Sequence, residues 1–129
     1  LGPRDLQYLA KRGTLREKMK LVCGNDDDIA VEIVSQPGAP ESFIVGVAES
    51  KAANAAALRY IAGQRSFRRN TSIVRALVFN PKTPVPSATG LLTLIRVDEL
   101  NKIATSRDLP DGTRQGARQL VEKRQKKRK

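Results

Sequence analysis

Residues 29–40 read IAVEIVSQPGAP, and residues 73–84, which lie 44 positions further on, read IVRALVFNPKTP. Each stretch carries apolar residues at helical spacing and ends in the same signal, a polar residue followed by proline. Because proline disfavours helical geometry in the residue before it, we expect helices to end at Gln36 and Asn80. A second proline three residues later suits the start of another helix, where its missing N–H would be unpaired anyway. The sequence therefore predicts the same helix, corner and helix twice.

This internal repetition continues beyond the two stretches, at an offset of 42 residues. The residues that correspond are Leu58, Ile61, Ala62 and Arg65 with Leu100, Ile103, Ala104 and Arg107. A period near 44 residues is the length of a helical unit that must stack on its neighbours to bury its apolar face. Gly46 and Gly90 are also 44 residues apart, and we expect close helix packing at both.

The segment Asn80-Pro81-Lys82-Thr83-Pro84 resembles the corner between helices in repeats of the HEAT, armadillo and leucine-rich-variant type. The resemblance covers about residues 26–109. It implies a helical surface that holds proteins or nucleic acids, but it transfers no set of functional residues. The chain lacks the cysteine cluster of some variant repeats, so no iron–sulfur cofactor is implied.

We predict an all-α fold, a short right-handed α-solenoid of about two HEAT- or armadillo-like repeats with a partial N-terminal repeat and a C-terminal capping helix. Expected helices cover residues 5–12, 14–23, 27–36, 40–50, 52–64, 71–79, 84–95 and 98–106, and a last one starts near Pro110. The repeat domain is expected over residues 1–113, followed by a basic helix and tail over 114–129. Leu1–Pro3 lacks an initiator Met, and we expect it to include a tag remnant or to open a piece of a longer chain.

The composition favours helices and argues against several kinds of chemistry. Aromatic residues make up only 4% of the chain, and no alternating β-branched run is closed by Asn-Gly or Asp-Gly. The absence of histidine excludes Ser-His-Asp triads, Cys-His pairs and most zinc sites, so the sequence predicts no enzyme. Asp26, Asp27 and Asp28 lack the spacing of a calcium loop and are expected to cap a helix. We expect no cofactor, no metal and no small-molecule substrate.

The single cysteine, Cys23, cannot form an internal disulfide. We therefore expect a protein of a reducing compartment, the cytoplasm. No apolar run is long enough to cross a bilayer, so we expect no membrane insertion.

Charge is unevenly distributed along this chain of net charge +11. Residues 24–50 carry six acids and no base, residues 51–82 carry seven bases and no acid, and eight bases against one acid follow from residue 114. The basic tail is either an arm that binds phosphate or carboxylate, or a solvated terminus, and the sequence leaves both open. Arg68 and Arg69 are interpreted as an anion clamp at a loop corner, whereas Arg65 is expected to bridge helix-end carbonyls.

Two functions remain open from the sequence. The leading hypothesis is a non-catalytic adaptor that engages an acidic or helical protein partner, and the alternative is a nucleic-acid-binding domain that contacts the phosphate backbone. Against the alternative, Phe67 is the only ring among the arginines, and single-strand binding usually needs stacking rings. The candidate binding residues for either partner are Arg65, Arg68, Arg69, Arg75, Arg118, Lys123, Arg124, Lys126, Lys127, Arg128 and Lys129.

Overall fold

The structure, a computed structural model, describes residues 3–127 and is built from helices throughout that range, without a strand. The prediction of an all-α fold is confirmed. The elements are α1 (Pro3–Arg12), α2 (Leu15–Val22), α3 (Asp27–Val34), α4 (Glu41–Glu49), α5 (Ala55–Gly63), α6 (Arg65–Arg68), α7 (Thr71–Val78), α8 (Val85–Leu91), the 3-10 turn η1 (Leu92–Leu94), α9 (Val97–Thr105) and α10 (Asp111–Lys127). None of these helices combines the length and the apolarity that a membrane span requires.

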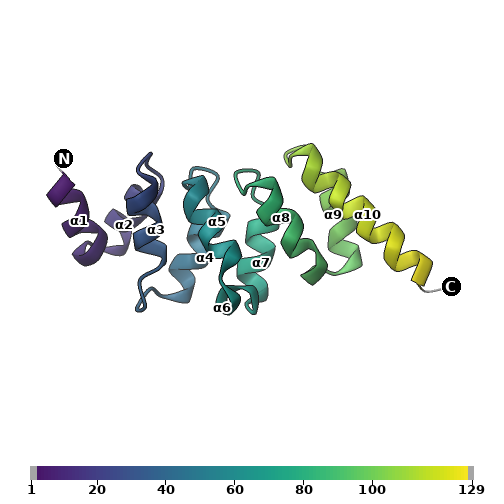
Figure 1. Cartoon of the computed structure of the whole chain (residues 1–129), viewed down its shortest axis with the longest axis horizontal. Coiled ribbons are helices and arrows are strands. Elements are labelled where there is room, and N and C mark those ends of the chain that lie inside the picture. Colours follow the sequence, from purple (N-terminus) through teal and green to yellow (C-terminus); the bar gives the residue numbers. More distant parts are fainter. Residues whose placement is uncertain (1–2, 128–129) are drawn as a thin grey trace.

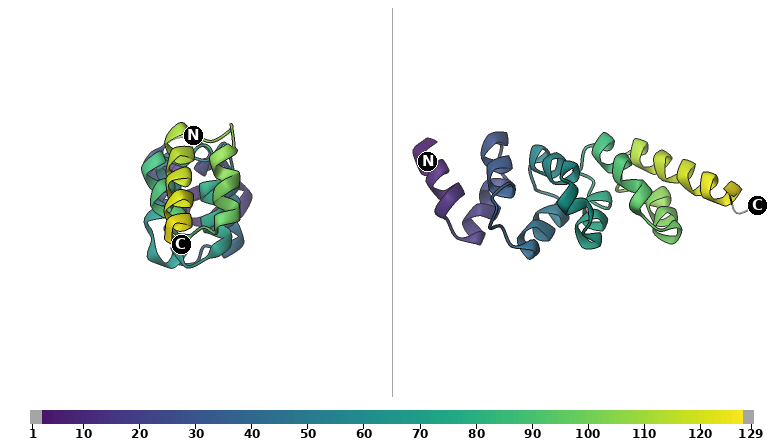
Figure 2. Two further views of the ribbon diagram at one scale, coloured as in Figure 1. Left: turned by 90° about the vertical axis from the view of Figure 1, so that its right-hand side faces the viewer. Right: turned by 60° about the horizontal axis from the view of Figure 1, so that its bottom comes forward.

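The helices form two rows along an elongated molecule (Figure 1). One row consists of α1, α3, α5, α8 and α10, in which each helix contacts the next. The other consists of α2, α4, α7 and α9, where α2 contacts α4, α4 contacts α7, and an ion pair joins α7 to α9. Viewed along the long axis, α9 and α10 lie side by side in front of the other helices (Figure 2). The chain therefore changes row at each corner.

The spacing of the helices explains the repetition in the sequence. From α2 onward, leaving the short α6 aside, helices begin at residues 15, 27, 41, 55, 71, 85, 97 and 111, so each helix with its loop takes 12 to 16 residues. Three such steps lead from α3 to α7 and from α4 to α8, which is the offset of 44, and from α5 to α9, which is the offset of 42. Because successive helices alternate between the rows, three steps lead from one row to the other. Equivalent helices of the two expected three-helix units therefore lie in different rows.

Local capping fixes where the helices start. Thr14 and Glu17 form a capping box at α2, in which Glu17 N–H donates to Thr14 Oγ1 and Thr14 N–H donates to Glu17 Oε1. Asp26 accepts from Ile29 N–H at 3.1 Å and caps α3, as the sequence predicts. Pro40 and Pro84 occupy the N-cap positions of α4 and α8, one residue before the first turn.

An aliphatic core fills the space between the rows. It consists mostly of Leu, Ile, Val and Ala, with Phe43 the one aromatic side chain buried among the described residues. The largest fully buried side chains include Ile33, Ile44, Leu58, Ile61, Leu77, Leu100 and Ile103. Burial of each such side chain contributes about 1.5–3 kcal/mol to folding. The apolar positions at helical spacing therefore face the partner row.

The loops lie along two edges, which are the upper and lower margins of the array in Figure 1. We call the upper edge the connections 23–26, 50–54, 79–84 and 106–110. We call the lower edge the connections 13–14, 35–40, 64–70, which includes α6, and 92–96, which includes η1.

Buried amides tie successive loops of the upper edge together. Asn54 Nδ2 donates to Gly24 O at 3.0 Å, and Asn80 Nδ2 donates to Ala48 O at 2.7 Å and Ser50 O at 2.8 Å. Asn80 is only 4% exposed, so these bonds are shielded from water. The loops that present side chains to solvent are thus held at fixed positions.

Three details differ from the sequence prediction. The corner that carries Arg65 and Arg68 is a one-turn helix rather than a loop. The helix expected over 84–95 ends at Leu91 and continues as the 3-10 turn η1. A Cβ atom on Gly90 would meet nothing within 4 Å, so the close packing expected there is wrong, whereas a Cβ atom on Gly46 would lie 3.4 Å from Met19 Cε.

Candidate functional site

The one-turn helix α6 holds three arginines on a fixed backbone at the lower edge. Phe67, in the middle of this turn, is half-buried against the core and anchors it. Arg65, Arg68 and Arg69 are exposed, and none has a carboxylate partner among residues 3–127. The structure thus brings together the three arginines that the sequence singles out. It offers no bridge from Arg65 to a helix-end carbonyl.

The junction that follows α6 is also fixed. Asn70 caps α7 by accepting from Ile73 N–H at 3.2 Å, and its Nδ2 donates to Glu41 Oε1 at the start of α4. This contact occupies one of the few carboxylates on the lower edge. Because Phe67 anchors α6 and the junction after it is held, the arginines can contact a ligand with little ordering of the backbone.

The basic residues of α10 fall into two groups, and the first serves the fold. Arg124 Nη1 donates to Ile95 O at 2.6 Å, and its Nη2 donates to Thr93 O at 3.0 Å. Arg118 Nη2 donates to Ala104 O at 3.4 Å, near the C-terminal end of α9. These guanidinium groups compensate carbonyls that have no partner within their own segments. Arg118 and Arg124, predicted as binding residues, attach α10 to the array.

The second group is free for a partner. Lys123 and Lys126 are exposed and have no hydrogen-bond or ion-pair partner among the described residues. Lys127 ends α10, and Arg128 and Lys129 lie outside the described residues. The expected boundary between residues 113 and 114 falls in the first turn of α10, where Thr113 is buried. Up to residue 127, the basic tail is a helix that contacts α8 and α9.

Arg75 faces a different surface from the α6 arginines. Its Nε lies 2.9 Å from Glu99 Oε1, and this ion pair joins α7 to α9. The pair leaves the Arg75 side chain 54% exposed but Glu99 only 16% exposed. Arg75 is therefore already partnered, and it does not belong to the cluster at α6.

Placed on the structure, the charges separate between the two edges. Besides α6, the lower edge carries cations at the end of α1, at the start of α2 and just before α9. The hydrogen bonds of Arg124 to Ile95 O and Thr93 O hold the last turns of α10 at the same edge. We define the basic edge as the exposed cations Lys11, Arg12, Arg16, Arg65, Arg68, Arg69, Arg96, Lys123 and Lys126. Six carboxylates lie on helix ends that meet this edge, namely Glu17, Glu32, Glu41, Asp98, Glu99 and Glu122.

Most of these carboxylates are already engaged, and Glu99 is paired with Arg75. Glu17 is held in the capping box, where the hydrogen bonds from Thr14 lower its pKa below the ordinary 4.5. Glu41 accepts from Asn70, and Asp98 lies 3.8 Å from the Arg96 Nε. The basic edge therefore presents a net positive potential to an approaching polyanion.

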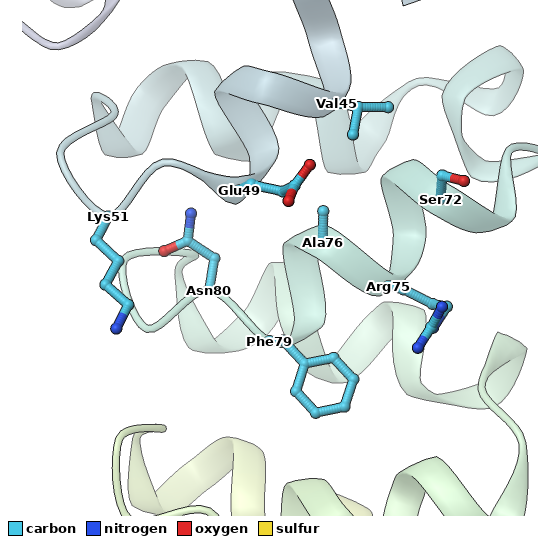
Figure 3. A pocket seen from close by; sticks show the side chains of 8 residues that line it. All are labelled: Val45, Glu49, Lys51, Ser72, Arg75, Ala76, Phe79 and Asn80. Carbon is cyan, nitrogen blue, oxygen red and sulfur yellow. The ribbon is translucent and has the colours of Figure 1, made fainter. Parts of the chain in front are cut away.

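A groove of about 470 Å³ opens between α4 and α7, on the row that carries Arg75 (Figure 3). Val45, Ala76 and Phe79 line it and are half-buried, while Glu49 and Lys51 lie at one end. The amide of Asn80, which also lines the groove, is occupied by its bonds to backbone carbonyls. The groove therefore combines charges of both signs with half-buried apolar side chains.

A smaller notch of about 240 Å³ lies between α5 and α8 and was missed by the sequence analysis. Arg59 and Arg68 line it, together with two helical glycines, Gly63 and Gly90. The signal that could have found it is the pair of glycines within two predicted helices, Gly63 near the end of 52–64 and Gly90 in the middle of 84–95. No aromatic ring is placed for stacking there, because Phe67 is half-buried.

Comparisons with models of protein families, with curated proteins and with solved structures found nothing that matches this chain.

Proposed function

We propose that this chain is a non-catalytic binding module, a short right-handed α-solenoid of HEAT or armadillo type, that holds an acidic segment of a protein partner along its basic edge. The observation that carries the proposal is the trio Arg65, Arg68 and Arg69 on the anchored turn α6, none of which has a carboxylate partner among residues 3–127. A guanidinium group binds carboxylate in a bidentate geometry, and a preformed turn reduces the entropy lost on binding. The single cysteine fits a reducing compartment, so we also propose a cytoplasmic location.

The positions of the aromatic side chains favour a protein partner over nucleic acid. Phe67 and Tyr60 are half-buried against the core, and the exposed ring of Tyr8 lies on α1, away from α6. Single-stranded binding normally uses exposed aromatic platforms on which bases stack. The basic edge instead offers charge, together with the notch between α5 and α8 that Arg68 lines.

The second candidate is a domain that binds the phosphate backbone of a duplex. It is favoured by the extent of the basic edge, which runs from Arg12 in α1 to Lys126 in α10, along the whole array (Figure 1). Such binding needs no aromatic ring and weakens steeply with salt through counterion release.

Matched charge variants test the proposal. One variant changes Arg65, Arg68 and Arg69 to Gln, and the control changes three exposed cations of the upper edge, Lys51, Lys82 and Arg107, to Gln, so both lose the same charge. The probes are a labelled peptide rich in Glu and Asp, a random-sequence DNA duplex and an RNA strand, each over a salt series.

We expect the α6 variant to lose about tenfold in peptide affinity and the upper-edge control to lose about twofold or less. Equal losses in both variants would show attraction by net charge alone and would overturn the proposal. Duplex binding that is tighter than peptide binding at physiological salt, and that depends on the α6 arginines, would establish the second candidate instead.

A further inference from the structure

The notch between α5 and α8 has an apolar floor and is lined by Arg68 of the basic edge. Ala62 and Leu91 form this floor and are buried, and the backbones of Gly63 and Gly90 complete it. Its volume of about 240 Å³ is large enough to accept a single aliphatic side chain. Water in such a site has few polar partners, so replacing it with an apolar group is favourable.

The two glycines are not required by the fold. A Cβ atom added to Gly63 or Gly90 would meet nothing within 4 Å, and no glycine among the described residues has a positive φ. Glycine is less favourable than alanine within a helix, so stability alone would favour alanine at both positions. The glycines of α10 are different, because a Cβ on Gly112 would lie 2.6 Å from Val85 Cγ1. Because Gly63 and Gly90 have no side chains, the notch that they line stays open.

Two arginines stand at the rim of this notch without carboxylate partners. Arg59 lies one helical turn before Gly63 on α5, and Arg68 reaches over from α6, with its Nη2 3.5 Å from Gly90 O. No acidic side chain lines the notch. A ligand that fits has an apolar part for the floor and negative charge for the rim.

We propose that this notch anchors one aliphatic side chain of the partner's acidic segment, while carboxylates on either side of that side chain pair with Arg59 and Arg68. The inference rests on the proposed function, since the same acidic segment occupies both the notch and the basic edge. A bare phosphate fits less well, because it has no apolar part to fill the floor formed by Ala62 and Leu91. The aliphatic anchor supplies specificity that charge alone does not.

Two labelled peptides of equal charge separate the anchor from the charge. Both consist of Glu and Asp residues, and they differ only at the centre, where one carries Leu and the other Gln. We expect the unaltered chain to bind the Leu peptide about tenfold more tightly, because Leu exchanges water for the apolar floor.

The variant G63A/G90L fills the notch without changing any charge. We expect it to bind both peptides with the affinity of the unaltered chain for the Gln peptide. G38A serves as the control, because its added Cβ also meets nothing within 4 Å but lies outside the notch, and it should keep the tenfold preference.

The outcomes distinguish the two proposals. Equal affinity of the unaltered chain for the two peptides would overturn the notch and leave the proposed function standing. No binding of either peptide would overturn both. A variant G63A/G90L that folds, shown by an unchanged helical circular dichroism spectrum, and still prefers the Leu peptide would also overturn the notch.

Discussion

The side-chain amides of Gln36 and Asn80, 44 residues apart, each donate to a carbonyl of an earlier helix in the same row. Gln36 Nε2 donates to Ala10 O in α1, and Asn80 Nδ2 donates to Ala48 O in α4 at 2.7 Å. Each residue precedes a proline and follows the last turn of its own helix. The polar residue of the stop signal thus ends one helix and ties it to its neighbour.

Replacing Asn80 tests the strength of this tie. Asn80→Ala removes the donor for two carbonyls, of Ala48 and Ser50, at a site only 4% exposed. We expect the free energy of unfolding in urea to fall by about 2–4 kcal/mol, because buried carbonyls lose their partners. Asn101→Ala, on the exposed face of α9, should change it by about 0.5 kcal/mol or less. A loss from Asn80→Ala no larger than that of the control would contradict a structural role for the amide.

Much of the fold is predictable from the sequence, because local rules govern the helices. The proline corners and the capping residues, such as Thr14 and Asp26, place nearly all helix ends within a few residues of those observed. The row to which a helix belongs is not predictable in this way. A helix of either row buries the same stripe at i, i+3 and i+4, so α3 and α7 look equivalent in the sequence although they lie in different rows.

The candidate site is predictable only in part, for a different reason. The sequence identifies the α6 arginines, because they lie within five residues of one another in a segment without acids. The sequence does not show that Arg124 serves the fold whereas Lys126 is free for a partner, because the carbonyl of Thr93 that Arg124 binds lies 31 residues away. The apolar notch beside Arg68 is likewise formed by two helices that only the tertiary fold brings together.

Stability at acidic pH should depend on the capping box of α2. Hydrogen bonds from Thr14 lower the pKa of Glu17 below 4.5, so the folded chain holds this carboxylate ionised at a pH where the unfolded chain protonates it. The stabilisation is complete above the unfolded pKa and is lost as the pH falls through the folded one. NMR titration of the Glu17 carboxyl should show Thr14→Ala raising its pKa toward 4.5. Ser35→Ala, outside the box, should leave it unchanged.

Only one of Arg124 and Lys126 should affect stability when it is replaced by Gln. Arg124→Gln removes charge-assisted hydrogen bonds to Ile95 O and Thr93 O, and we expect a loss of about 1–3 kcal/mol in unfolding free energy. Hydrogen exchange should then show faster opening of the last turns of α10. Lys126→Gln should leave both measurements nearly unchanged, since this side chain has no partner in the described part of the chain. Equal protection of α10 in the two variants would argue that Arg124 does not hold the helix.

Two glycine-to-alanine changes should have opposite signs. Gly90→Ala adds a Cβ to open space in α8, so it should raise unfolding free energy by about 0.5–1 kcal/mol through helix propensity. Gly112→Ala places a Cβ 2.6 Å from Cγ1 of the stiff, β-branched Val85, so it should lower the stability by about 1–3 kcal/mol. Thermal unfolding should show a melting temperature about 2–5 °C higher for Gly90→Ala. Destabilisation by Gly90→Ala would mean that the fold itself requires this glycine.

Substitutions of Arg75 and Arg69 should separate an effect on stability from an effect on binding. Arg75 is paired with Glu99 at 2.9 Å, so Arg75→Gln should lower unfolding free energy by about 0.5 kcal/mol, the modest value of a half-exposed ion pair. It should leave the affinity for an acidic peptide nearly unchanged, because the guanidinium group is already occupied. Arg69→Gln should do the reverse, since Arg69 has no carboxylate partner and lies on the anchored turn α6.

For both variants, urea unfolding measures the stability and fluorescence anisotropy measures the affinity for the acidic peptide. Both substitutions remove one positive charge, so long-range attraction weakens equally in each, and any difference in affinity comes from position. A weaker peptide affinity for Arg75→Gln than for Arg69→Gln would move the binding site from the basic edge to the groove between α4 and α7. That groove is lined by Arg75 and by the half-buried Val45 and Ala76.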